Sequence, residues 1–228
     1  LKQFDLVLAN PPYSIKQWDR AKWASDKWGR NKYGTPPQGN ADYAFFQHII
    51  ASTKPNSGRS AILYPHGILF RDQEKAMREK IVAADLVECV IGLGPNLFYN
   101  SPMKSCIVIC RSSKHVDKKG KILFINAVEH IREERNMSYL DPEHILAIAK
   151  AYNKWKDVEG FSRVVELDEI QSNQSRLSIP LYVKTHSDDG DHRELPEVLG
   201  EWLQSSNELR ASMDNLFEML DEFNDIKE

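Results

Sequence analysis

The chain has 228 residues, of which 41% are hydrophobic and 28% charged. With 11 glycines and 11 prolines, this composition excludes collagen-like, low-complexity and wholly disordered proteins. The length allows one large domain, or one domain with a substantial appendage. No apolar run reaches the roughly 20 residues of a membrane helix and no leader opens the chain, so we expect a cytoplasmic protein with no membrane partner.

The formal net charge of −3 is unevenly distributed along the chain. Residues 1–80 hold 13 Lys and Arg against 7 Asp and Glu, a charge of +6, whereas the remaining residues carry −9. A basic first part is compatible with a polyanionic partner. The acidic second part argues against a nucleic-acid surface along the whole molecule.

Short apolar runs alternate with longer amphipathic segments in the first half, which predicts an α/β fold with a mainly parallel sheet covered by helices. Strands are expected near Phe4–Ala9, Ser60–Tyr64, Val87–Ile91, Ser105–Cys110 and Lys121–Ile125. Helices are expected at 42–52 and 72–84, the second capped by Asp72. The stretch from Pro11 to Asn40 has no clear period and predicts a long functional or mobile loop.

The character of the sequence changes after about Val128. Asp141 followed by Pro142 predicts a capped helix that continues to about Trp155. After a polar stretch, residues 176–183 have an extended pattern but contain Pro180, which favours an edge or wrapping segment over a central strand. Residues 185–194 are polar and acidic, as expected of a linker.

From Leu195 onward, apolar residues spaced three to seven apart in an acidic context predict one amphipathic helix. This apolar stripe either packs on its own domain or docks a partner subunit. In the second case the candidate docking residues are Trp202, Leu209, Met213, Leu216 and Leu220.

The strongest motif is Asn10-Pro11-Pro12-Tyr13, directly after the first expected strand. The segment FDLVLANPPYS resembles the catalytic motif of amino-group methyltransferases that use S-adenosylmethionine. The alternative is a proline turn that only ends a strand. An adenine amino group is a poor nucleophile because its lone pair is delocalised into the ring, and two acceptors aimed at its N–H groups would localise that pair. Asn10 offers a side-chain carbonyl, Pro11 a backbone carbonyl of restricted direction, and Tyr13 a face for stacking.

The resemblance extends over essentially the whole chain. The blocks YGTPPQGNADYAFFQHII, GRSAILYPHGILFR, VIGLGPNLFYNSPMKSCIVIC, GKILFINA and LSIPLYV together resemble the modification subunit of type I restriction-modification systems, whose activity is N6-adenine methylation of DNA. The resemblance implies a Rossmann-like class I S-adenosylmethionine-dependent methyltransferase sheet, of which only the carboxy-terminal half is present, followed by a mainly helical tail. The expected parts are the half-domain 1–130, a helix with wrapping segment and linker at 131–194, and the helical tail 195–228.

Carried over residue by residue, the family's catalytic motif falls on Asn10, Pro11, Pro12 and Tyr13, and Asn10 also contributes to the cofactor pocket. The second aromatic wall for a flipped base falls on Phe98, with Tyr99 in the competing register; the alternative is that both are buried aromatics at a strand end.

Four other candidate residues near the expected strand ends remain open. Asp42 and Tyr43 line the cleft, or serve only as a helix N-cap and a core residue. His66 and Gly67 lie where such sheets bind ligands, although a lone histidine there is more often structural.

The loop after the motif interleaves aromatic and basic residues. Trp18, Trp23 and Trp28 recur every five residues among the candidate DNA-contacting cations Lys16, Arg20, Lys22, Lys27, Arg30 and Lys32. Such a pattern suits nucleic acid, with cations on phosphate and rings on bases. It is equally compatible with a solvated loop whose tryptophans pin it to the domain.

Two further features predict no site. Gly92-Leu93-Gly94 resembles part of a dinucleotide-binding loop. That pattern requires its next glycine at position 97, where this sequence has Leu97. Cys89, Cys106 and Cys110 fit neither a disulfide framework nor a metal motif, so we expect buried thiols and no metal.

In the family, the glycine-rich loop and acidic residue that hold the methyl donor precede the NPPY motif, and this chain contains neither. We therefore expect it to be part of a longer subunit, with an exposed sheet edge and no methylation by itself. The resemblance implies duplex DNA, a specificity (recognition) subunit, a restriction subunit and a second methyltransferase subunit as partners. The alternatives are a methyltransferase acting on protein glutamine or RNA, or a noncatalytic assembly module.

Overall fold

The computed structural model describes residues 1–98, 102–135, 137–184 and 195–225. Its contacts divide the chain into two compact units, Leu1–Thr185 and His186–Glu228. The expected linker at 185–194 and Tyr99 lie outside the described residues. The three-part division expected from the sequence therefore stays a prediction.

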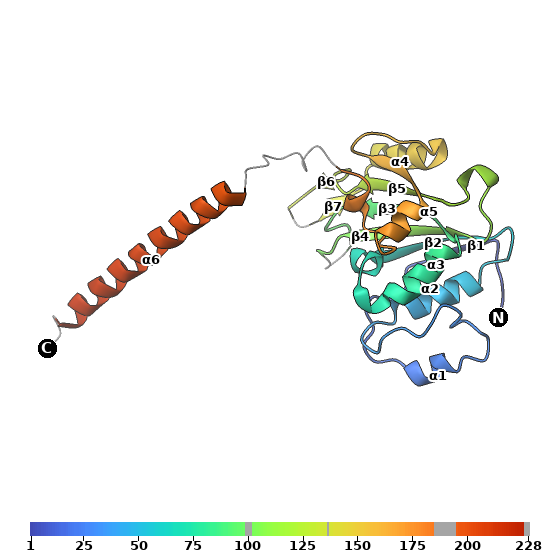
Figure 1. The fold of residues 1–228 in the computed structure, drawn as a ribbon, viewed down its shortest axis with the longest axis horizontal. Helices are drawn as coiled ribbons and strands as arrows, with labels where there is room; N and C mark the ends of the chain where they lie inside the picture. Colours follow the sequence, from blue (N-terminus) through green and yellow to red (C-terminus); the bar gives the residue numbers. More distant parts are fainter. Residues whose placement is uncertain (99–101, 136, 185–194, 226–228) are drawn as a thin grey trace. The chain divides into compact units, whose positions relative to one another are not determined.

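The first unit is built on a mixed six-stranded sheet in the order β1-β2-β4-β3-β5-β8 (Figure 1). Its strands are β1 (Leu6–Ala9), β2 (Arg59–Pro65), β3 (Val87–Leu93), β4 (Ser105–Arg111), β5 (Lys121–Ala127) and β8 (Ser162–Glu166). Strands β1, β2, β3 and β5 run in one direction, and β4 and β8 run against them. The five expected strands are confirmed within two residues at each end, and β8 was not expected.

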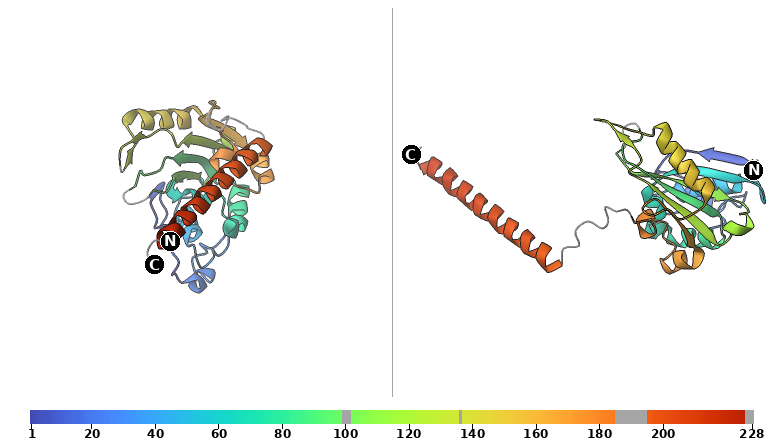
Figure 2. Two further views of the ribbon diagram at one scale, coloured as in Figure 1. Left: turned by 90° about the vertical axis from the view of Figure 1, so that its left-hand side faces the viewer. Right: turned by 90° about the horizontal axis from the view of Figure 1, so that it is seen from above.

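Helices cover both faces of this sheet (Figure 2). Helices α2 (Asp42–Ala51), α3 (Lys75–Ala83) and α5 (Leu167–Ser172) pack on one face, where Phe46 and Ile81 join a core with Tyr64 and Phe124. Helix α4 (Pro142–Lys154) covers the other face, over a cluster that includes Cys89, Leu123 and Ala151. Because both faces are covered, every residue of β3 is buried.

Short elements complete the unit. They are α1 (Arg20–Ala24), the 3-10 turns η1 (His66–Leu69), η2 (Asp72–Glu74), η3 (Val116–Lys118) and η4 (Ile179–Leu181), and the small hairpin β6 (Arg132–Glu133) and β7 (Ser138–Tyr139). All three cysteines are buried free thiols, as expected.

Two predicted helix starts have different outcomes. Helix α4 begins as expected, with a capping box between Asp141 and His144 and Pro142 in its first turn. The predicted cap at Asp72 is wrong, because the 3-10 turn η2 begins there and α3 starts at Lys75 without a side-chain cap. The carboxylate of Asp72 instead faces Arg176, at 3.4 Å.

The segment after β8 wraps over the sheet. Leu177, Ile179, Tyr182 and Val183 are each at most 3% exposed, and the Tyr182 ring stacks on Phe124 with centroids 4.3 Å apart. The expectation of a wrapping segment around Pro180 is confirmed, since its backbone forms η4 and adds no strand to the sheet.

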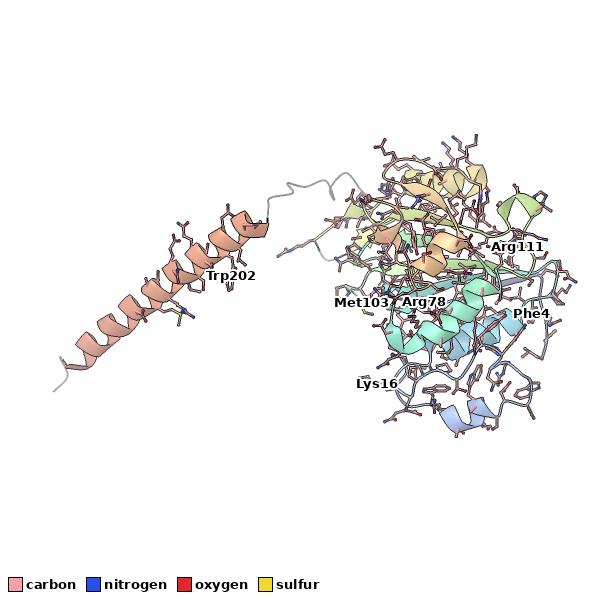
Figure 3. The ribbon with its side chains drawn as sticks, in the orientation of Figure 1. Phe4, Lys16, Arg78, Met103, Arg111 and Trp202 are labelled. Atoms are coloured by element: carbon pink, nitrogen blue, oxygen red, sulfur yellow. The ribbon has the colours of Figure 1, made fainter. Side chains whose placement is uncertain are left out.

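The second unit contains the helix α6 (Leu195–Asp225), which confirms the amphipathic helix expected there. Trp202 on this helix is labelled in Figure 3. Among its described apolar side chains, Trp202 is 64%, Leu209 63% and Met213 48% exposed. The side chains of Leu216 and Leu220 lie outside the described residues. Among the described residues no helix combines the length and apolar character needed to cross a membrane.

Gly94 has a structural role that explains its place after β3. A Cβ at this position would lie 2.6 Å from the Val128 carbonyl oxygen and 2.7 Å from a side-chain carbon of Ile131. We expect Gly94→Ala to lower the free energy of unfolding by about 1–3 kcal/mol through overpacking. The matched control is Gly39→Ala, which would meet no atom within 4 Å. Urea denaturation measures both, and equal midpoints would contradict the close approach at Gly94.

Candidate functional site

The site lies along the side of the sheet where the parallel strands have their carboxyl ends. Strands β1, β2 and β3 end at this edge, and the antiparallel β4 begins there. The NPPY motif, the turn from His66 to Arg71 and Ser105 therefore meet in space, although about 90 residues separate the first from the last. Ligands bind at this carboxyl edge in open α/β sheets.

The motif residues differ in exposure. Pro11 is buried, and Asn10 and Pro12 on either side of it are exposed. The Asn10 side chain makes no hydrogen bond within the described part of the chain, so its amide is available to a ligand. The buried ring of Pro11 fixes the backbone next to Asn10, so the side-chain carbonyl of Asn10 is held in place as a hydrogen-bond acceptor.

Tyr13 is half-buried at the same edge. Burial raises the pKa of its hydroxyl, and the neighbouring Ser105 side chain offsets part of that effect. Behind it, Nε2 of His66 donates to the Ser105 carbonyl oxygen at 2.8 Å. Burial lowers the pKa of His66, so the imidazole is neutral at pH 7 and has a structural hydrogen bond.

Ser14 follows the motif in a left-handed backbone conformation, with φ at 50°. Its backbone N–H donates to Asp42 Oδ1 at 2.8 Å. The other carboxylate oxygen of Asp42 accepts from Arg71 Nη1 at 2.6 Å. Asp42 is fully buried and is the first residue of α2, so the predicted N-cap role is wrong: Ala41 occupies the N-cap position.

Gly67 makes room for the guanidinium of Arg71. A Cβ at position 67 would lie 2.8 Å from Arg71 Nε. Tyr43, the neighbour of Asp42, is 1% exposed and donates from its hydroxyl to the Ile68 carbonyl oxygen at 3.2 Å. The interpretation of Tyr43 as a core residue is therefore confirmed. Gly67 leaves the space that the ion pair between Arg71 and Asp42 needs.

A second carboxylate is buried next to this pair. Glu74 has no exposed surface and lies 3.5 Å from Arg71 Nη1, and its oxygens make no hydrogen bond to any other described residue. Burial raises the pKa of Glu74 to about 7, against the lowering effect of Arg71. Arg78 is also buried (Figure 3), and donates to the carbonyl oxygens of Ser175 and Arg71 at 2.9 Å each.

Phe98 lies in the loop between β3 and β4, which starts and ends at the same sheet edge as the motif. Its side chain is half-buried. Its assignment as the second aromatic wall, and the choice between it and Tyr99, stay predictions.

The tryptophans of the loop after the motif differ in their surroundings. Trp18 is half-buried and donates from Nε1 to the Gln38 carbonyl oxygen at 3.0 Å. Trp23 is also half-buried, whereas Trp28 is 53% exposed. A hollow of about 320 Å³ lies between this loop and α2, lined by Ile15, Trp18, Trp23, Arg30, Ala41, Ala44, Phe45 and His48.

The cations of this loop form two groups. Arg30 is tied down, because Asp26 pairs with it at 2.5 Å and its guanidinium lies 4.8 and 4.9 Å from the ring centroids of Trp23 and Trp28. Arg20 donates to the Pro36 carbonyl oxygen at 2.8 Å. The remaining cations are exposed and lie on one short stretch of chain, namely Lys16, Lys22, Lys27 and Lys32. Their assignment to DNA stays a prediction.

Within the described ranges no three His, Cys, Asp or Glu side chains are grouped closely enough to hold a metal ion. Sequence reasoning named Asp42 and Gly67 but missed Arg71 and Glu74. The available signal in the sequence was an Asp at the start of an apolar helical segment, with arginines downstream. Without the fold, nothing showed which arginine lies opposite.

Comparison with known proteins agrees with this architecture. Residues 1–191 match the N-6 DNA methylase family. The chain is 36% identical over 224 residues to the type I restriction enzyme MjaVIII methylase subunit of Methanocaldococcus jannaschii, covering 93% of this chain and 38% of that protein. It is 33% identical to the HindI methylase subunit of Haemophilus influenzae, covering 93% and 50%.

Solved structures have the same fold. The type I restriction-modification methyltransferase subunit from Streptococcus thermophilus superposes with a TM-score of 0.75 at 32% identity, over 81% of this chain and 39% of that one. The chain thus spans between a third and a half of the length of these relatives. Because the family match extends over residues 1–191 of 228, the chain belongs to the N-6 DNA methylase family.

Proposed function

We propose that this chain is the carboxy-terminal part of a type I restriction-modification methyltransferase subunit. The full-length subunit transfers a methyl group from S-adenosylmethionine to the N6 amine of an adenine swung out of duplex DNA. The observation that carries the proposal is the NPPY motif at the carboxyl end of β1, with Asn10 exposed and free to accept and Tyr13 half-buried beside it. Family membership and the names of the relatives support DNA as the substrate.

In this mechanism the chain positions and polarises the amine. The Asn10 side-chain carbonyl and the Pro11 backbone carbonyl accept the two N–H groups, which draws the nitrogen toward tetrahedral geometry and localises its lone pair. The rigid, buried Pro11 keeps that acceptor in place before the base arrives. Tyr13 stacks on one face of the extruded base, and Phe98 is the candidate for the other. The methyl–sulfur bond would break as the methyl–nitrogen bond forms, and the methylated nitrogen would then lose one proton to water, so no side chain needs to ionise before transfer.

The donor supplies an electrophilic methyl group when bound. This chain contributes one group to the donor-binding pocket, the exposed side-chain amide of Asn10 at the end of β1. That position fits the end of the donor nearest the reacting amine. The glycine-rich loop and the ribose-binding acid of the family are absent from these 228 residues. Pocket residues must therefore come from another part of the full-length subunit.

We expect the 228 residues alone to bind S-adenosylmethionine poorly and to methylate no DNA. Isothermal titration should show no saturation at donor concentrations that saturate the full-length subunit. Tight binding by the isolated chain would refute the missing-pocket interpretation.

The loop after the motif is proposed to hold the DNA backbone. Lys16, Lys22, Lys27 and Lys32 are exposed and have the charge to meet phosphates, and the exposed Trp28 ring is suited to stacking. Trp18, Trp23 and Arg30 are proposed to hold the loop itself, since Trp18 donates to Gln38 within the loop, Arg30 pairs with Asp26, and the Arg30 guanidinium lies over the Trp23 ring. Arg20 is oriented by Pro36 and remains exposed to a phosphate.

Helix α6 is proposed to dock the specificity subunit, which brings the restriction subunit and a second methyltransferase subunit into one cytoplasmic complex. Trp202→Asp or Leu209→Asp places a charge in the exposed apolar stripe and is expected to weaken association on the order of 10–100-fold. The control is Gln204→Asp, which lies about 200° around the helix from Trp202. Light scattering of the mixed subunits measures the effect, and unchanged association of the first two variants would rule out docking through this stripe.

The function is tested in a bacterial host without adenine methylation. The full-length subunit is expressed with and without its specificity subunit, and N6-methyladenine is mapped in the host DNA. Modification at one recurrent site, dependent on the specificity subunit, supports the proposal. Methylation of RNA or of protein glutamine instead would identify another NPPY enzyme. No methyl transfer to any of the three would favour a noncatalytic assembly module.

A further inference from the structure

We propose that Asp42, held by Arg71, is a positioning residue that fixes the direction of the NPPY motif through the backbone of Ser14. The proposal rests on the function proposed above and adds residues from two other elements to that site. Asp42 belongs to α2 and Arg71 follows η1, so neither is part of the motif's own loop.

The backbone of Ser14 needs an external restraint. Its φ of 50° places a non-glycine residue in the left-handed region, which costs about 1–2 kcal/mol relative to ordinary conformations. The compensating contact is the hydrogen bond from the Ser14 N–H to Asp42 Oδ1 at 2.8 Å. A hydrogen bond to a buried carboxylate is strong enough to offset that cost.

Asp42 is in turn fixed from several sides. Arg71 Nη1 holds the second carboxylate oxygen at 2.6 Å, and the Tyr64 hydroxyl donates to the Asp42 backbone carbonyl at 3.1 Å. With no exposed surface, this carboxylate is tolerated only because both of its oxygens are paired. One of those two partners is the residue that directly follows the motif.

Arg71 is also constrained. Its backbone N–H donates to the Gly67 carbonyl at 3.1 Å, and its own carbonyl accepts from Arg78 Nη1 at 2.9 Å. The absence of a side chain at Gly67 leaves space for the guanidinium, which also reaches the Ser14 hydroxyl at 3.4 Å. The restraint on the motif therefore extends into the core of the first unit through Arg78.

The consequence for the reaction is geometric. Ser14 lies one residue beyond Tyr13, so a change in its backbone rotates the Tyr13 ring and shifts the acceptors before it. A misplacement of about 1 Å in a reacting group can cost on the order of 100-fold in rate. The Asp42–Arg71 pair can thus control the rate of transfer without touching base or donor.

The test uses the full-length subunit in complex with its specificity subunit and a duplex carrying the mapped site. Asp42→Asn, which is isosteric, is expected to lower the single-turnover rate on the order of 10–100-fold while the KM values for duplex and donor change less than about twofold. Arg71→Lys keeps the charge but loses the fork, and is expected to show a smaller loss of the same kind. The control is Asp72→Asn, whose side chain is 78% exposed, and it should behave as wild type.

A second substitution separates positioning from a merely structural role. Ser14→Gly accepts a positive φ without steric cost, so combined with Asp42→Asn it should recover part of the lost rate. Failure to recover any rate, an unchanged rate in Asp42→Asn, or a loss that only follows a loss of folded protein would each overturn the proposal.

Amide hydrogen exchange makes the result independent of catalysis. Asp42→Asn should increase exchange at the Ser14 amide by about tenfold or more relative to wild type and Asp72→Asn. Unchanged exchange would refute the restraint even in an active enzyme. Faster exchange in a subunit that methylates nothing would support the restraint and refute only the proposed function.

Discussion

Asn10→Ala in the full-length subunit is expected to lower the single-turnover rate of adenine methylation on the order of 10²–10³-fold, with duplex affinity nearly unchanged. The Asn10 amide is exposed and makes no hydrogen bond within the described residues, so its removal costs the fold little. What is lost is one of the two preorganised acceptors that localise the lone pair of the amine. Rapid-quench kinetics with labelled donor measures the rate.

Two further variants make this result specific to an acceptor. Asn10→Asp keeps an oxygen in place and should retain more activity than Asn10→Ala. Asn153→Ala changes the same residue type at an exposed position on α4 and should leave the rate unchanged. Equal rates for Asn10→Ala and wild type would show that the NPPY motif does not take part in methyl transfer through Asn10.

Glu74 should make the stability of the first unit fall as pH rises from about 5 to 8. Burial raises the pKa of Glu74 from a usual 4.5 to about 7, so the folded state binds a proton that the unfolded state releases. The stabilising contribution of the neutral form is complete below pH 4.5 and is lost as the pH rises through 7, a difference of about 3 kcal/mol.

Glu74→Gln should therefore flatten this dependence, because the substituted side chain cannot ionise. Urea unfolding at several pH values between 5 and 8 gives the slope. Glu79→Gln is the matched control in α3, the helix that begins directly after Glu74, since its side chain is 46% exposed and pairs only loosely with Lys75 at 3.8 Å. A slope that persists in Glu74→Gln would assign the pH dependence to another group.

Local patterns predicted the elements whose signals lie within a few residues. The Asp141-Pro142 start of α4 and the apolar runs of β2 to β5 are of this kind, because capping and burial act over one turn or one strand. Strand β8 was missed because its apolar core is only two residues long and is flanked by Arg163 and Glu166. Arg163 is kept there by a bidentate pair with Glu169 in α5, at 2.8 Å for both contacts.

The site was predictable only in part, for a related reason. The NPPY motif is contiguous, so its chemistry could be inferred from the residues alone. The support behind it joins Ser14 to Asp42 and Asp42 to Arg71, each pair separated by 28 or 29 residues. Such pairings depend on strand order, and the antiparallel β4 between β2 and β3 brings Ser105 to the same place.

Strand β1 also affects how the protein can be handled. It stands at one end of the strand order, and Leu6 and Leu8 on it are 50% and 72% exposed. Its outer backbone groups have no strand partner within the described chain, and it has neither a proline nor an inward-pointing charge to block pairing. In the full-length subunit we expect strands from another part of that subunit to pair with this edge, whereas in the isolated chain the open edge favours association with a second copy. Variants of the isolated 228-residue chain are therefore best compared at matched, low concentrations, because self-association through β1 would otherwise add to every measured stability.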